Sequence, residues 1–181
     1  MSNTDRKPEA GALGFTGSAP TRIATRWQEQ YARMKRWHSR ISDATTVDSR
    51  AVDDVYAFFV CCYHLKDWIR NDDSVAKRVS DEVERAVSQS VPLCLSADIT
   101  NGFKHLKRTK PVRISADATV KAVGTSLDSF DLDTSLLGGI VVVVDGTNEL
   151  DMRGVADGCV EAWDAFLTDR GLPPPVGPVP G

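Results

Sequence analysis

Apolar residues recur at helical spacing over much of the chain. A first helix is expected from about Arg22 to Ile41, where side chains that favour a core fall three or four positions apart: Ile23, Trp27, Tyr31, Met34, His38 and Ile41. A second is expected from about Val52 to Arg70. Its stretch from Val55 to Leu65 is apolar almost all round, which is typical of a helix that neighbours cover on every side. We therefore expect this helix at the centre of the fold.

Three further helices follow from caps and spacing. The segment 71–74 supplies cap residues for a third helix, which should lie on the surface and bury one face: Val75, Val79, Val83 and Ala86. Ser90 and Pro92 mark the start of a fourth helix that reaches about Lys107. Asp151 is the expected N-cap of the last helix and Gly171 its end, and one face is apolar: Met152, Val155, Ala156, Cys159, Trp163 and Phe166.

The fourth helix has an apolar stripe formed by Leu95, Ile99, Gly102 and Leu106. A glycine in a helix interior costs roughly 1 kcal/mol relative to alanine. We therefore expect Gly102 to let a neighbouring helix approach closely.

Between the fourth and last helices the apolar period changes from helical to alternating. Residues 112–122 alternate apolar and polar side chains, which predicts a half-buried strand. The β-branched run Ile140–Val144 ends in Asp145-Gly146, a tight-turn signal, so Thr147–Leu150 is expected to return as a short strand. The predicted fold class is α+β, mostly α, with a four-helix cluster followed by a small antiparallel sheet of about three strands and a C-terminal helix.

The domain limits follow from composition. Residues 20–172 are expected to form a single globular domain, between a disordered N-terminal segment (1–19) and a Pro-rich disordered tail (173–181). No apolar run approaches the roughly 20 residues that a bilayer requires. We expect a cytoplasmic protein with no membrane contact, whose four cysteines are reduced and mostly buried: Cys61, Cys62, Cys94 and Cys159.

Candidate chemistry lies on the fourth and second helices. Cys94, Asp98, Asn101 and His105 follow a 4, 3, 4 spacing and form one row beside the apolar stripe. On the second helix, His64 and Asp67 are three positions apart, so their side chains can meet. If the two helices pack together, a speculative catalytic set converges: His64, Asp67, Asp98, Asn101 and His105. A polar network that is satisfied within the core is the structural alternative.

Basic residues favour an anionic partner. The first 113 residues contain 19 of the 22 Lys and Arg residues and 14 of the 25 Asp and Glu residues, whereas the remainder is strongly acidic. The candidate binding residues lie on the first helix and around the end of the fourth, with Trp27 and Trp37 interleaved on the first: Arg26, Arg33, Arg36, Lys104, Lys107 and Arg108. Attraction between the two halves of the chain, or solubility alone, would also explain the asymmetry.

Two resemblances are carried by short segments. His64-Leu65-Lys66-Asp67-Trp68 followed by Asn101-Gly102-Phe103-Lys104-His105 is similar to a set of small uncharacterised bacterial and phage proteins with HLKDW and NGxKH segments. That resemblance implies a shared fold and no activity. The helical part also resembles HEPN-type bundles, many of which are metal-independent ribonucleases with an Arg-x4–6-His motif. Arg33 and His38 have that spacing, although Met34 takes the place of the usual polar residue after the arginine.

Several enzyme classes lack their motifs here. The chain contains no GxGxxG, GxxxxGK[ST] or GxSxG sequence, so no nucleotide cofactor and no Ser hydrolase is predicted. The leading hypothesis is a binding module whose basic helical face contacts RNA, DNA or a protein partner. The alternatives are a HEPN-like metal-independent ribonuclease with His105 or His38 as acid/base, and a metal-binding protein that uses His64, Asp67, Asp98 and His105. No cofactor and no defined metal site are predicted, and enzyme and binding protein both stay open.

Overall fold

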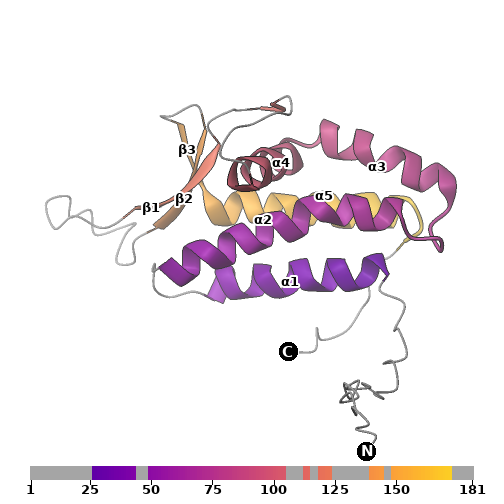
Figure 1. Cartoon of the computed structure of the whole chain (residues 1–181), viewed down its shortest axis with the longest axis horizontal. Coiled ribbons are helices and arrows are strands. Elements are labelled where there is room, and N and C mark those ends of the chain that lie inside the picture. The colour runs from indigo at the N-terminus through magenta and orange to yellow at the C-terminus, as the bar shows by residue number, and fades with distance from the viewer. Residues whose placement is uncertain are drawn as a thin grey trace, which may run out of the picture.

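The computed structural model describes residues 26–43, 49–104, 112–114, 118–123, 139–144 and 148–172. Helices dominate this part of the chain (Figure 1): α1 (Trp27–Asp43), α2 (Ser49–Arg70), α3 (Lys77–Gln89), α4 (Val91–Lys104) and α5 (Met152–Asp169). Three short strands lie between α4 and α5: β1 (Thr119–Val123), β2 (Gly139–Val144) and β3 (Asn148–Asp151). The expected helical cluster is confirmed. The two ends predicted to be disordered, 1–19 and 173–181, lie outside the described residues.

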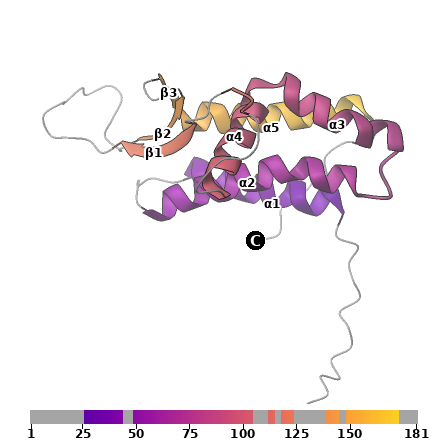
Figure 2. The same ribbon diagram turned by 45° about the horizontal axis from the view of Figure 1, so that its top comes forward.

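The helices form two layers. α1 and α2 lie side by side in one layer, α3 and α5 lie over them, and α4 crosses between the layers (Figure 2). The strands form one antiparallel sheet in the order β1-β2-β3, with Val120 opposite Val142 and Val142 opposite Leu150. This sheet sits at one end of the helical cluster (Figure 1).

The core is centred on α2, as its apolar sequence predicts. Phe58, Phe59, Cys62 and Leu65 are completely buried. Removing such side chains from water stabilises the fold by roughly 1.5–3 kcal/mol each. From the opposite layer, α5 contributes Trp163, whose indole N–H donates a hydrogen bond to the backbone carbonyl of Cys62 (3.2 Å). No helix among the described residues is long and apolar enough to cross a bilayer.

The apolar face of α1 follows the expected spacing. Trp27, Tyr31, Met34 and Ile41 are buried, whereas Ile23 lies outside the described residues. Trp27 is only 2% exposed. Its side chain belongs to the core, as its place in the apolar stripe predicts, so it adds no aromatic surface to the basic residues that flank it in sequence.

The predicted cap of the third helix is also wrong. α3 begins at Lys77, and no side chain caps it. The Asp72 carboxylate instead accepts hydrogen bonds from the backbone N–H of Ser74 (2.8 Å) and, 45 residues away in sequence, from that of Trp27 (3.0 Å). Since Trp27 is the first residue of α1, Asp72 satisfies a free N–H at the start of a distant helix.

The caps of α5 agree with the sequence. The Asp151 carboxylate accepts a hydrogen bond from the backbone N–H of Gly154 (2.8 Å), and Asp151 also closes β3. After the last turn, Gly171 has a φ of 70°, in the left-handed region that favours glycine. The six residues expected on the apolar face of α5 are all buried.

The close approach expected at Gly102 lies elsewhere. A Cβ at Gly102 would be 3.8 Å from the backbone oxygen of Ala118, an ordinary contact. A Cβ at Gly158 of α5 would be only 3.0 Å from Cγ of Pro92 at the start of α4. The sequence shows a glycine inside α4 and glycines inside α5, but only the packing shows that the close contact is between Gly158 and Pro92.

The alternating segment from Val112 onward does not all become strand. β1 starts at Thr119, and residues 113–114 form a bend. The backbone N–H groups of Arg113 and Ile114 donate to the Asp98 carboxylate (3.1 and 2.8 Å) instead of to a neighbouring strand. The start of the expected strand is therefore fastened to α4.

Candidate functional site

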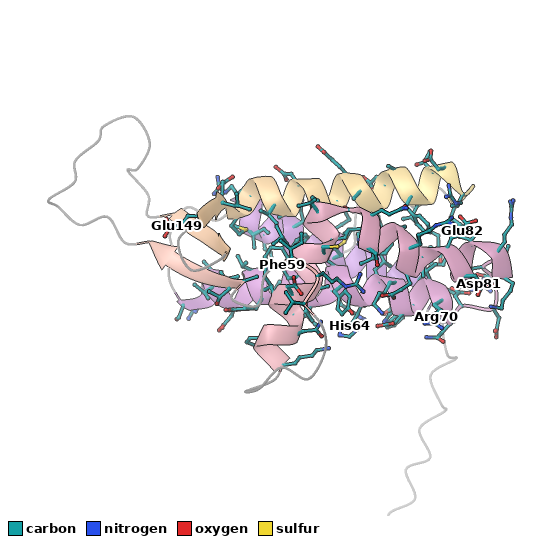
Figure 3. All side chains as sticks on the ribbon, turned by 90° about the horizontal axis from the view of Figure 1, so that it is seen from above. Phe59, His64, Arg70, Asp81, Glu82 and Glu149 are labelled. Atoms are coloured by element: carbon teal, nitrogen blue, oxygen red, sulfur yellow. The ribbon has the colours of Figure 1, made fainter. Side chains whose placement is uncertain are left out.

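The expected contact between α2 and α4 exists. On α2, Nδ1 of His64 lies 2.9 Å from Oδ2 of Asp67, as their spacing predicts. From the last residue of α4, Nζ of Lys104 contacts Nε2 of the same ring. Figure 3 shows His64 at the edge of the helical cluster, beside the end of α4. Asp67 and Lys104 thus contact opposite nitrogens of one imidazole ring.

Asp67 also belongs to a network of charges that the sequence does not reveal. Lys66 lies 2.8 Å from Asp67 and 3.3 Å from Glu84 of α3. Arg113 contacts Glu84 and donates to Oγ of Ser88 (2.8 Å). This network joins α2, α3 and the segment after α4.

The network holds its carboxylates in the charged form. Burial raises the pKa of Asp67, but hydrogen bonds from Lys66 and His64 outweigh it and leave the pKa below its ordinary value. For Glu84, burial is likewise outweighed, by the hydrogen bond from Arg113 and the charge of Lys66, so its pKa is also lowered. The carboxylates of Asp67 and Glu84 therefore stay charged near neutral pH and are poorly suited to acid/base catalysis.

The structure describes only part of the proposed catalytic set. Asp98 is only 1% exposed, and its carboxylate receives the two backbone hydrogen bonds from Arg113 and Ile114. Asn101 is half-buried on α4, and His105 lies outside the described residues. The structure pairs His64 with Asp67 and assigns Asp98 a structural role. Within the described ranges, no group of three or more His, Cys, Asp or Glu side chains is arranged to hold a metal ion.

A row of arginines lies along one flank of α1. Arg33, Arg36 and Arg40 are three and four positions apart and share one side of the helix. Arg40 donates two hydrogen bonds to Asp54 of α2 (3.0 and 3.1 Å). The guanidinium of Arg33 lies 5.6 Å from the ring of Trp68, also on α2. We call these three arginines the basic flank.

The opposite flank of α1 faces α5. The Tyr31 hydroxyl donates to Asp164 (2.6 Å), and Nε2 of His38 lies 2.6 Å from Oδ1 of Asp157. Arg33 instead contacts Glu29, Gln30 and Trp68. Five positions on a helix correspond to a rotation of about 140°, so Arg33 and His38 leave α1 in different directions.

An open pocket lies against the second half of α1. The described residues that line it include four basic side chains and no acidic one: Arg33, Lys35, Arg36, Trp37, His38, Ser39, Arg40 and Ser42. Arg33 is partly neutralised by Glu29 (3.2 Å) and Arg40 by Asp54. No described carboxylate forms an ion pair with Lys35 or Arg36.

The other candidate binding residues are only partly placed. Arg26 is exposed just before α1, and Lys104 is exposed at the end of α4. Lys107 and Arg108 lie outside the described residues. Sequence reasoning missed Lys66, Glu84 and Arg113, because no local pattern shows which charges meet across helices.

The cysteines agree with the sequence prediction. Cys61, Cys62, Cys94 and Cys159 are all buried free thiols. Burial raises the pKa of Cys159 well above its ordinary value, so this thiol stays protonated. The cysteines therefore act as core side chains.

Comparison with known proteins gives no further guide to the function of this mostly helical fold. No protein-family model, no curated protein and no solved structure matches the chain. The function therefore has to be argued from the surfaces described above.

Proposed function

We propose that the protein is a binding module that contacts nucleic acid through the basic flank of α1 and the pocket beside it. The observation that carries this proposal is the lining of that pocket, where two of the four cations, Lys35 and Arg36, form no ion pair with a described carboxylate. A row of cations can contact successive phosphates of a nucleic acid. Each such contact releases a counterion and so favours binding.

Aromatic side chains add to the basic flank. The guanidinium of Arg40 lies 4.9 Å from the ring of Trp37, and that of Arg33 lies 5.6 Å from the ring of Trp68. Such contacts hold the arginine side chains in fixed directions. Ordered cations lose less entropy when they bind phosphate, which favours association.

The test is a salt titration of binding to labelled single-stranded RNA and to duplex DNA, measured by fluorescence anisotropy. The double variant Lys35→Glu/Arg36→Glu should bind RNA at least ten-fold more weakly. Its slope of log K against log salt should fall by about 0.7 for each phosphate of a single strand that no longer meets a cation. Circular dichroism would verify that α1 stays folded.

A matched control lies on α3. Arg78→Glu/Arg85→Glu changes the net charge by the same amount at two exposed arginines of α3, and it should bind like the unmodified protein. Equal decreases in affinity for both double variants would indicate non-specific attraction. An unmodified protein that binds neither RNA nor DNA at low salt would refute the proposal.

A second candidate, a metal-independent ribonuclease of the HEPN kind, is supported by the pair of His38 and Asp157. A carboxylate 2.6 Å from the imidazole orients the ring and supports a general acid/base, and His38 also lines the basic pocket. The same RNA incubated with a chelator reports on this candidate. Cleavage that disappears in a folded His38→Ala variant would favour it, whereas intact RNA after prolonged incubation would exclude it.

A further inference from the structure

Phe103, near the end of α4, has an unusually exposed aromatic ring. Its side chain is 60% exposed, although one face of the ring stacks on Tyr56 of α2 with centroids 4.5 Å apart and planes at 22°. Among the described residues, the other large exposed apolar side chains are aliphatic: Val91, Val112, Ile114 and Leu150. Phe103 therefore presents an aromatic surface to solvent.

The ring beneath Phe103 is fixed in place. Tyr56 is half-buried against the core, and its hydroxyl is 3.3 Å from Oγ1 of Thr119 at the start of β1. Helix α2, helix α4 and strand β1 thus meet at this point. A stacked pair held from three elements forms a flat platform with a defined orientation.

The basic residue nearest the platform in sequence is Lys104, whereas Asp53, exposed three positions before Tyr56 on α2, is acidic. Lys104 follows Phe103 directly and contacts His64 of α2. An exposed aromatic ring and a cation on consecutive residues fit a group that has both a planar ring and a negative charge.

We propose that Phe103, supported by Tyr56, stacks on an unpaired base of a single-stranded nucleic acid. This inference rests on the proposed function, and it specifies a single strand because the bases of a duplex are already stacked on one another. Proteins bind single strands by combining basic grooves with aromatic platforms. One ring beside a cation is also small compared with the apolar patches of several hundred Å² that mark protein interfaces.

The decisive variants are Phe103→Leu, which keeps an apolar side chain and removes the ring, and Phe103→Trp, which keeps a ring. Loss of one base stack should weaken binding of a labelled 12-nucleotide single-stranded RNA about five-fold or more. Phe103→Trp should bind at least as tightly as the unmodified protein. Inorganic polyphosphate, which has charge and no bases, should bind all three proteins equally.

A second measurement locates the contact directly. RNA substituted with 5-iodouridine and irradiated should cross-link to the peptide that contains Phe103 or Tyr56, as read by mass spectrometry. Cross-links confined to Trp37 or Trp68 would overturn the platform and leave the basic flank as the site.

The outcomes separate the two proposals. Suppose that the unmodified protein binds RNA. The platform is refuted, and the basic flank is not, if Phe103→Leu binds RNA as tightly as the unmodified protein. The same conclusion follows if Phe103→Leu loses affinity for RNA and for polyphosphate by the same factor. If the unmodified protein binds no nucleic acid, both proposals fail. If Phe103→Leu instead abolishes capture of an apolar helical peptide and leaves RNA binding intact, the surface serves a protein partner and the stacking role is overturned.

Discussion

Asp98 is the only charged side chain that is fully buried among the described residues. Its two oxygens accept hydrogen bonds from two consecutive backbone N–H groups, those of Arg113 and Ile114. A buried carboxylate is costly unless such donors compensate for the lost water. Asp98 therefore holds the bend at residues 113–114 against α4.

This role predicts the effect of Asp98→Asn. The asparagine side chain keeps one oxygen as an acceptor and places its NH2 group against the other backbone N–H, so that part-buried N–H loses its partner. The free energy of unfolding should fall by about 1–3 kcal/mol, measured by urea denaturation. The same change at Asp53, which is exposed on α2, should alter stability by less than about 0.5 kcal/mol. Equal effects at both positions would contradict the structural role.

At the scale of elements, the crossing of α4 over its neighbours depends on small contacts. Gly158 of α5 faces the ring of Pro92 at the start of α4, and the thiol of Cys159 donates to the Pro92 carbonyl (3.3 Å). In the next layer, the hydroxyl of Ser96 donates to the backbone carbonyl of Phe59 (3.1 Å). These contacts bring the backbone of α4 close to both α5 and α2.

The close approach predicts opposite effects for one substitution at two glycines of α5. Gly154→Ala should stabilise the protein by about 0.5–1 kcal/mol, because alanine favours helix and the new Cβ has room, 3.5 Å from Asp151. Gly158→Ala should destabilise it by about 1 kcal/mol, because the new Cβ meets Pro92 at 3.0 Å and the packing must shift. Thermal unfolding of both variants is the measurement. A Gly158→Ala variant as stable as Gly154→Ala would mean that α4 and α5 separate easily.

At the scale of the whole molecule, charge pairs join elements that also meet in the core, where α3 buries Val79, Val83 and Val87. Lys66 and Glu84 connect α2 with α3, and Arg113 connects α3 with the segment after α4. Arg170, after α5, pairs with Glu82 of α3 (2.7 Å). These ion pairs thus link α3 to α2, to the segment after α4 and to the end of α5.

This network predicts how stability changes with pH. The pKa values of Asp67 and Glu84 are lower in the folded protein than in an unfolded chain, so their contribution is present above the unfolded values, roughly pH 4–4.5. It is lost as the pH falls through the lower folded values. The free energy of unfolding should therefore be nearly constant from pH 7 to 5 and fall steeply below about pH 4.

Two variants separate the network from general acid denaturation. Glu84→Gln should be less stable at pH 7 and should lose less stability between pH 5 and pH 3 than the unmodified protein. Glu161→Gln, an exposed change on α5, should follow the unmodified protein. Parallel acid curves for the unmodified protein and Glu84→Gln would refute the link to this network.

The sequence by itself determined the elements that depend on neighbouring residues. The periodic apolar positions of α1, α2 and α5 are buried as expected, Asp151 and Gly171 bound α5, and His64 meets Asp67 three positions away. These features depend on the geometry of a single helix, which spacing alone encodes.

Only the tertiary structure decided the features that join distant residues. It assigned Asp72 to the start of α1 and Asp98 to the backbone at 113–114, and it stacked Phe103 on Tyr56. A polar or aromatic side chain could pair with several groups at similar energy. The packing of the helices selects the partner, because a hydrogen bond forms only with a group that lies within about 3 Å. That choice is a property of the assembled layers, since no local pattern records which distant residues the packing brings together.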